Sequence, residues 1–166
     1  MLTVNKHLPA GAGIARALLE RAARVVLDWD TRGKSRFAAV DSGGRPLAVF
    51  LARGTVLRDG DILVAEDGAL IRVVAAPQPV LQVRICPEHG TPLDLLRAAY
   101  HLGNRHVVLE VRETLLQLEP DPVLAAMLRR MHLKVDEAVC AFEPEAGAYA
   151  QAGHAHAVHD GHEHHA

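Results

Sequence analysis

The spacing of apolar residues changes at residues 76–80, and this change most constrains what the chain folds into. Before it, short segments rich in Val, Ala and Leu alternate with Gly and Asp, which is typical of strands joined by tight turns. After it, apolar residues at helical spacing appear between further strand-like segments. The intervening sequence APQPV carries two prolines, so we predict a linker and a domain boundary there.

Residues 1–75 are predicted to form a small all-β domain. The sequences DSGGRP and RDGD indicate hairpins, because Gly adopts the positive φ that tight turns require. Residues 32–36, RGKSR, are predicted to form a hairpin tip and not a phosphate site, because they lack the GxxxxGK[ST] spacing. Residues 7–24 fit either a short helix or a loop. The expected strands are LTVNKHL, AARVVLDW, SRFAAV, RPLAVFLA, DILVA and ALIRVV.

Residues 76–145 are predicted to form an α+β domain with the order βαββαβ, the ferredoxin-like arrangement, with both helices on one face of a four-stranded sheet. We expect one helix to follow Thr91 as N-cap and to end at Gly103. A second helix is expected to follow Asp121 as N-cap. The apolar residues expected to pack on the sheet are Leu93, Leu96 and Tyr100 on the first helix, and Val123, Leu124, Met127, Leu128 and Met131 on the second.

Six of the eleven histidines lie near the C-terminus. Residues 146–166 show no hydrophobic periodicity, so we predict a flexible His-rich tail. Neutral imidazole binds zinc, copper and nickel, and spaced histidine tracts are typical of metal binding, the alternative being a merely solvated tail. The spacing selects no metal. The predicted tail ligands are His154, His156, His159, His162, His164 and His165.

Two further histidines flank the predicted end of the first helix. His101 falls in the last turn, where a polarised side chain stabilises the helix by about 0.3–1 kcal/mol, so a helix-end role competes with metal ligation. His106 is expected to be exposed at the start of the next strand. One imidazole does not fill a tetrahedral or octahedral shell, so His106 needs further ligands. A two-fold dimer supplies a second copy of it, and the tail supplies more.

Charge and motifs argue against several functions. The formal net charge of −2 disfavours nucleic acid as a partner. No apolar run approaches the roughly 18 residues of a membrane span, and with no signal peptide visible we expect a cytoplasmic protein without membrane contact. Cys86 and Cys140 form no CxxC motif, and we expect two buried free thiols in preference to a disulfide. GxSxG and HExxH are absent, and we expect no enzyme.

The chain resembles the urease accessory nickel chaperones (UreE) over nearly all of its 166 residues. The resemblance lies in the His-rich tail and in RGKSR at 32–36, LARGTVLRDGDIL at 51–63, AYHLGNRHVVLEV at 99–111 and DPVLAAMLRRMHL at 121–133. It implies a homodimer in which His106 binds nickel as cargo with its copy from the other subunit, while tail histidines add to the site. Zinc and copper are further ions for the same imidazoles.

The resemblance also implies that the N-terminal domain mediates protein contacts. Nickel would pass to the urease apoprotein through a complex with the urease accessory GTPase. Some members carry a histidine–aspartate–histidine run at the start of the second helix, but this chain has Pro120, Asp121 and Pro122 there, so those secondary sites are not expected. The alternatives are a passive zinc or nickel storage protein acting through the tail, and a protein-binding β module with incidental histidines.

Overall fold

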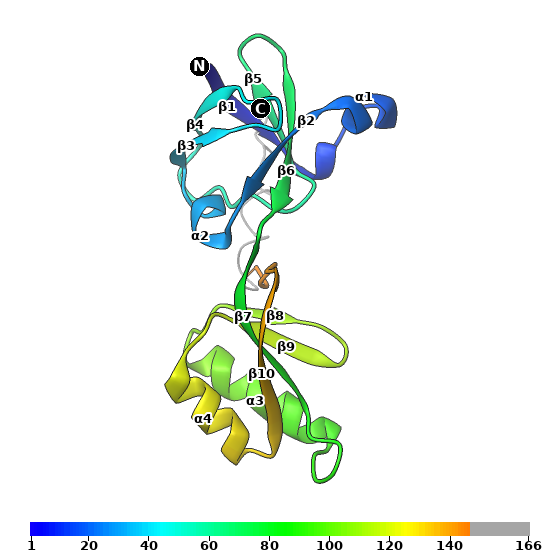
Figure 1. Cartoon of the computed structure of the whole chain (residues 1–166), viewed down its shortest axis with the longest axis vertical. Helices are drawn as coiled ribbons and strands as arrows, with labels where there is room; N and C mark the ends of the chain where they lie inside the picture. Colours follow the sequence, from blue (N-terminus) through cyan, green and yellow to red (C-terminus); the bar gives the residue numbers. More distant parts are fainter. Residues whose placement is uncertain (147–166) are drawn as a thin grey trace, which may run out of the picture.

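The computed structural model describes residues 1–146, so the six predicted tail ligands lie outside the described residues. Within residues 1–146 the chain forms two sheets, one above the other along the long axis of the molecule (Figure 1). The upper sheet contains residues 2–75 and the lower sheet residues 77–141. No helix in this described part is both long and apolar enough to cross a membrane.

The N-terminal sheet has the strand order β2-β6-β5-β1-β4-β3. The pairs β1–β4 and β2–β6 are parallel, and the other neighbours are antiparallel. All six predicted strand segments are confirmed, because alternating apolar residues bury one side of each strand in a common core. The strands are β1 (Leu2–Leu8), β2 (Ala23–Leu27), β3 (Arg36–Val40), β4 (Pro46–Phe50), β5 (Ile62–Ala65) and β6 (Leu70–Ala75).

Short helical segments join the first strands, so the domain is not purely β. The segment left open between helix and loop contains a 3₁₀ turn at Pro9–Gly11 and helix α1 (Arg16–Arg21). The predicted hairpin tip at residues 32–36 is wrong. Helix α2 (Trp29–Arg32) occupies its start, because the Asp28 carboxylate accepts the Thr31 N–H at 2.8 Å and caps the helix.

The C-terminal sheet has the order β10-β7-β9-β8 with every neighbouring pair antiparallel. Both helices pack on the same apolar residues of the sheet and therefore cover one face of it. Asp121 caps the second helix as predicted, accepting the N–H groups of Val123 and Leu124 at 2.7 and 2.9 Å. The elements are β7 (Pro77–Ile85), α3 (Pro92–Asn104), β8 (Leu109–Val111), β9 (Leu115–Leu118), α4 (Pro122–Arg130) and β10 (Leu133–Ala141).

The predicted linker at residues 76–80 is instead the beginning of β7. This strand pairs with β10 from Pro77 to Ile85, but with β9 only from Leu81 to Arg84. The first residues of β7 therefore pair with a neighbouring strand on one side only. Proline, which has no N–H to donate, is tolerated there. Only Ala76 separates β6 from β7, so the junction between the two sheets is short.

The buried face of α3 is not the predicted one. Leu95, Ala98 and Leu102 pack on the sheet, whereas the predicted stripe of Leu93, Leu96 and Tyr100 is 50%, 67% and 70% exposed. Both sets of residues share helical spacing, and spacing alone does not decide which of two apolar sides faces the sheet. The predicted stripe of α4 is partly right: Leu128 is buried, while its first residue Val123 is 68% exposed.

Candidate metal centre

His106 lies just beyond the C-terminus of α3 and is exposed. Helix α3 runs through Gly103 and ends at Asn104, so the predicted stop at Gly103 is wrong. The His106 N–H donates to the Gly103 carbonyl at 2.9 Å, and the Val107 N–H donates to the Leu102 carbonyl at 3.1 Å. These two bonds form a Schellman motif, which satisfies the last carbonyls of the helix.

The Schellman motif places His106 in the left-handed backbone region, with φ of 57°. Glycine usually occupies this position, because a β-carbon there meets the following carbonyl oxygen and costs roughly 1–2 kcal/mol. The chain nevertheless carries an exposed imidazole at this point. A strained backbone at an exposed polar residue is a reason to look for a function of its side chain.

His101 occupies the last turn of α3 and is exposed. Its ring lies edge-on to that of Tyr100, with the two ring centroids 5.4 Å apart. Its place in the last turn fits the helix-end role that competes with ligation at His101.

Within residues 1–146 of one subunit, no three His, Cys, Asp or Glu side chains come together to hold a metal ion. Asp121 is occupied in capping α4. The thiols are free as predicted, but they are half-buried and not fully buried, and the Cys140 thiol donates to the Gln117 amide oxygen at 3.1 Å. In residues 1–146, His106 is therefore not part of a cluster of three or more side chains that could hold a metal ion.

The last residues before the tail contact β8, the strand that follows His106. The Glu145 N–H donates to the carbonyl oxygen of Leu109, the first residue of β8, at 2.8 Å. Leu109 is three residues beyond His106. The last described residues thus lie along the edge of β8.

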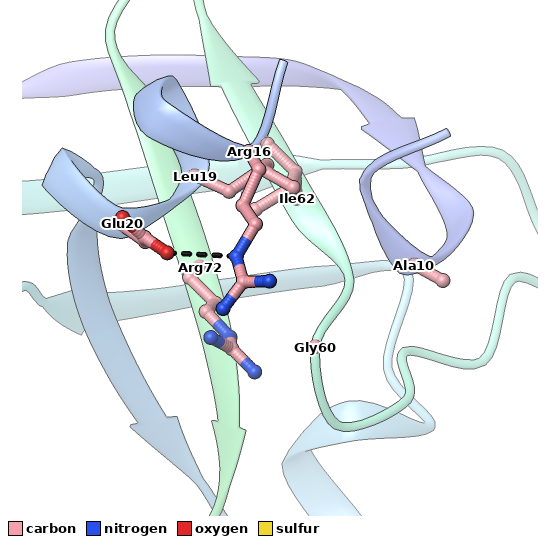
Figure 2. Close-up of a pocket in the computed structure, with 7 residues that line it drawn as sticks. All are labelled: Ala10, Arg16, Leu19, Glu20, Gly60, Ile62 and Arg72. Atoms are coloured by element: carbon pink, nitrogen blue, oxygen red, sulfur yellow. Dashed lines mark hydrogen bonds and ion pairs between the residues drawn. The ribbon is translucent and has the colours of Figure 1, made fainter. Parts of the chain in front are cut away.

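A pocket of about 340 Å³ opens on the N-terminal domain between α1, β5 and β6 (Figure 2). Leu19 and Ile62 supply apolar surface, and Arg16 and Arg72 also line the pocket. Arg16 pairs with Glu20 through a 2.8 Å bond from its Nε, whereas Arg72 forms no ion pair within residues 1–146. The pocket therefore offers an unpaired cation beside apolar side chains.

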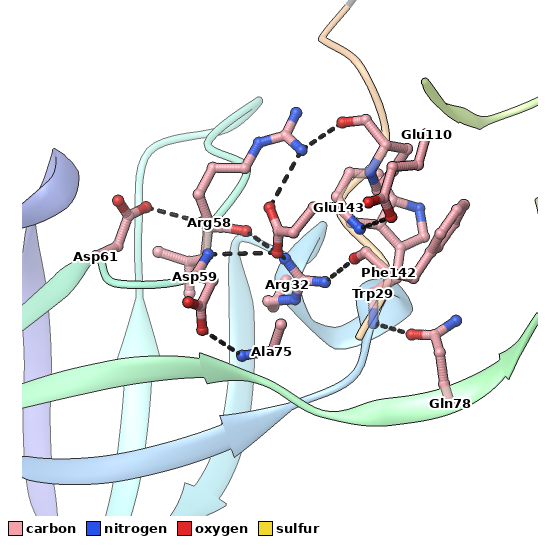
Figure 3. Close-up of polar contacts among 12 residues, drawn as sticks. Trp29, Arg32, Arg58, Asp59, Asp61, Ala75, Gln78, Glu110, Phe142 and Glu143 are labelled. Atoms are coloured by element: carbon pink, nitrogen blue, oxygen red, sulfur yellow. Dashed lines mark hydrogen bonds and ion pairs between the residues drawn. The ribbon is translucent and has the colours of Figure 1, made fainter. Parts of the chain in front are cut away.

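Sequence reasoning missed the residues at the domain junction, above all Trp29, Arg32 and Glu143 (Figure 3). Arg32 was assigned to a hairpin tip, yet its side chain is fully buried. Its partner Glu143 lies 111 residues further along the chain. The sequence offers one signal for this site, because Trp29 is the chain's single tryptophan and stands next to charged residues.

The described chain thus has two domains and carries an exposed histidine in a strained backbone position at the end of a helix. Comparison with known proteins gives the family. Residues 4–76 match the family model described as the UreE urease accessory protein, N-terminal domain, and residues 78–166 match that of its C-terminal domain.

Individual relatives are similar in sequence to this chain over most of its length. It is 66% identical over 154 residues to the urease accessory protein UreE of Paracidovorax citrulli, covering 93% of this chain and 73% of that protein. The protein of the same name from Methylibium petroleiphilum is 68% identical over 152 residues, 92% of this chain and 70% of the relative. That of Albidiferax ferrireducens is 62% identical over 161 residues, 97% and 92% respectively. The chain belongs to the UreE family of urease accessory proteins, and it is an accessory protein and not an enzyme.

Proposed function

We propose that this protein is a nickel metallochaperone that binds Ni(II) and delivers it for assembly of the urease active site. Family membership supports a role in urease maturation. The observation that carries the nickel site is His106 itself: an exposed imidazole, in a strained backbone position, without a complete ligand set in the described part of its subunit. An incomplete site of this kind suits cargo that must leave again.

The first missing ligand is proposed to be the second copy of His106 in a homodimer. The exposed apolar side chains of Leu93, Leu96 and Tyr100 lie on the helix that ends beside His106. Exposed apolar stripes mark protein contacts. A two-fold axis next to this end of α3 would bring the two copies of His106 together, because a residue on such an axis meets its own symmetry mate.

The remaining ligands are proposed to come from the tail. His154 follows Glu145 by nine residues, and an extended chain spans at most about 3.3–3.6 Å per residue, so it reaches about 30 Å from that point. The carbonyl oxygen of Leu109 accepts the Glu145 N–H. Leu109 is three residues beyond His106 and therefore at most about 11 Å from it. The reach is therefore ample. The proposed tail ligands are His154, His156, His159, His162, His164 and His165.

The domains are proposed to divide this work, with residues 1–75 for protein contacts, 76–145 for the metal site and 146–166 as the His-rich tail. Strand order β10-β7-β9-β8 and the βαββαβ succession support a ferredoxin-like metal domain. The pocket with Arg72 supports contact with an acidic surface on the urease accessory GTPase or the urease apoprotein. Zinc and copper are proposed as further ions for the same imidazoles, in a cytoplasmic protein without nucleic acid or membrane partners.

A metallochaperone passes nickel to the urease apoprotein within a complex, whereas a passive storage protein only releases free nickel. We would mix nickel-loaded protein with the urease apoprotein, the accessory GTPase and a chelator in excess over nickel, and measure urease activity. A chaperone activates the apoprotein despite the chelator, because the ion passes within a complex. A passive storage protein gives no more activity than free nickel under the same chelator, and that result would reject the proposal.

A further inference from the structure

A set of side chains at the domain junction holds the backbone that follows β10 (Figure 3). We name Trp29, Arg32, Arg58 and Glu143 the junction clamp. Arg32 is fully buried, and its two Nη atoms donate to the Glu143 carboxylate and to the carbonyl oxygen of Phe142. Phe142 is also fully buried and meets the edge of Trp29, with ring centroids 6.1 Å apart. The junction clamp therefore involves contacts to both the backbone and the side chains of residues 142 and 143.

Arg58, which also belongs to the N-terminal domain, contacts the same segment after β10. Its guanidinium donates to the carbonyl oxygen of Pro144 and lies 3.6 Å from the Glu143 carboxylate. The guanidinium carbons of Arg32 and Arg58 lie 5.3 and 5.2 Å from the centroid of the Trp29 ring, within cation–π range. The N-terminal domain thus supplies two cations to the Glu143 carboxylate, and both of them lie against the Trp29 ring.

The other side of the same segment is held by the C-terminal domain. The Glu143 N–H donates to the Glu110 carboxylate at 2.7 Å, and the Glu145 N–H donates to the Leu109 carbonyl at 2.8 Å. Glu110 and Leu109 belong to β8, the strand that follows His106. Residues 142–145 consequently cross from the end of β10 to the far edge strand of the sheet while the clamp holds them.

Burying an arginine side chain at a domain junction costs free energy. Burying its charge requires a partner, and well-packed apolar side chains serve equally well where only stability is needed. The Arg32 Nε is buried and has no hydrogen-bond partner within residues 1–146. The ion pair between the fully buried Arg32 and the partly exposed Glu143 instead fixes a geometry, and the point that it fixes is where the chain departs toward the tail.

We propose that the junction clamp positions the His-rich tail for the nickel site: Arg32 and Glu143 fix the start of the tail beside β8, the strand that follows His106, and thereby raise the affinity of the site. This inference rests on the proposed function, in which His106 and tail histidines share nickel. Arg32 and Glu143 are positioning residues and do not touch the metal. The N-terminal domain controls nickel affinity through them.

Release of the clamp changes the tether in two ways. His154 is nine residues beyond Glu145 but thirteen beyond Ala141, the last residue of β10, so the tether becomes longer. Its starting point also moves from the β8 edge to the β10 edge, three strand spacings or about 14 Å away. Effective concentration falls as a tether lengthens and as its origin moves away from the site. We expect a roughly three- to tenfold weaker nickel site.

The test compares Glu143→Gln with Glu145→Gln by calorimetric nickel titration of the intact chain. Both variants remove one negative charge from the same segment. The Glu145 side chain is exposed, and within residues 1–146 only its backbone N–H forms a hydrogen bond, so this variant is the matched control. We expect Glu143→Gln to weaken the tightest site three- to tenfold and Glu145→Gln to leave it unchanged. In chains truncated after Ala146, the two variants should bind nickel alike.

Trp29, the single tryptophan of the chain, reports the state of the clamp through its fluorescence. Charge reversal in Glu143→Arg should shift its emission, and an unchanged spectrum would contradict the clamp itself. A shifted spectrum with unchanged nickel affinity in the intact chain would overturn the positioning role. Failure of the proposed function looks different, because the wild-type affinity would then depend neither on His106 nor on the tail.

Discussion

His106 and His132 occupy equivalent positions at the ends of α3 and α4, each in the left-handed backbone region with φ of 57° and 60°. The two histidines share a backbone geometry, but only His106 adjoins β8 and the proposed site. His132 lies instead near the capping box of α3, where it makes a minor contribution to the lowered pKa of Asp94. The pair therefore allows the backbone role of a histidine to be separated from its role as a ligand.

Glycine at position 106 should give a more stable fold than alanine. Both His106→Gly and His106→Ala remove the imidazole, but only alanine keeps a β-carbon in the left-handed region. We expect the glycine variant to be more stable by about 1 kcal/mol in urea unfolding, the strain relief being partly offset by the extra chain entropy of glycine. The same order is expected at position 132. An alanine variant as stable as the glycine variant would show that the position is not left-handed in solution.

A charge on the exposed face of α3 should separate the proposed dimer. Leu96 is 67% exposed and lies between Leu93 and Tyr100 on that face. We expect Leu96→Asp to be a folded monomer by sedimentation velocity, because the carboxylate would be buried without a partner at the interface. Val26 is 59% exposed on the other domain, so Val26→Asp is the control and should remain dimeric. A dimeric Leu96→Asp protein would place the interface elsewhere.

The capping box of α3 should make part of the stability depend on acid pH. Hydrogen bonds from the Thr91 hydroxyl and N–H, both 2.8 Å, hold the pKa of Asp94 below its ordinary value of 3.8, with smaller help from Arg97 and His132. A carboxyl whose pKa is lowered by folding stabilises the fold above its unfolded pKa and loses that effect as the pH falls through its folded pKa.

Asp94→Asn should therefore melt at a lower temperature than the parent protein at pH 7, with the gap closing as the pH falls below about 4. Circular dichroism at 222 nm, followed on heating at several pH values, measures the gap. A gap of equal size at pH 7 and pH 2 would mean that the charge of Asp94 does not contribute.

Reversing one charge in the pocket of the N-terminal domain should weaken binding to a partner with an acidic surface. Arg72 lines the pocket without an ion pair in the described part of the chain, whereas Arg36 is exposed on β3, away from it. We expect Arg72→Glu to weaken the complex with the urease accessory GTPase at least tenfold in a pull-down titration, and Arg36→Glu to have little effect. Equal losses for both variants would indicate only a general effect of net charge.

Alternation of apolar residues and glycine turns predicted every strand of the N-terminal sheet, because each strand buries one side in the same core. The same approach missed α2, whose four residues are too few to show a helical period. It also chose the wrong side of α3, since that helix carries apolar residues on two sides and only the packed structure shows which is covered.

At the candidate metal centre, the exposure of His106 was predictable from the sequence, but its backbone geometry was not. The exposure of His106 followed from its place after a helix, yet its left-handed backbone did not, because glycine at 103 was the more obvious helix end. The burial of Arg32 was not predictable either. It depends on Glu143 and Phe142, which reach Arg32 only when the chain returns to the junction after β10.

Calorimetric titration of nickel into the intact protein, His106→Asn and His132→Asn tests the central proposal most directly. Asparagine tolerates the left-handed region and removes the imidazole in both variants, so the backbone effect is matched. With native mass spectrometry on the same samples, we expect the parent protein and His132→Asn to hold their tightest nickel as one ion per two chains. We expect His106→Asn to lose that ion. Retention of the tightest site in His106→Asn would contradict a nickel centre at His106 and favour storage by the tail alone.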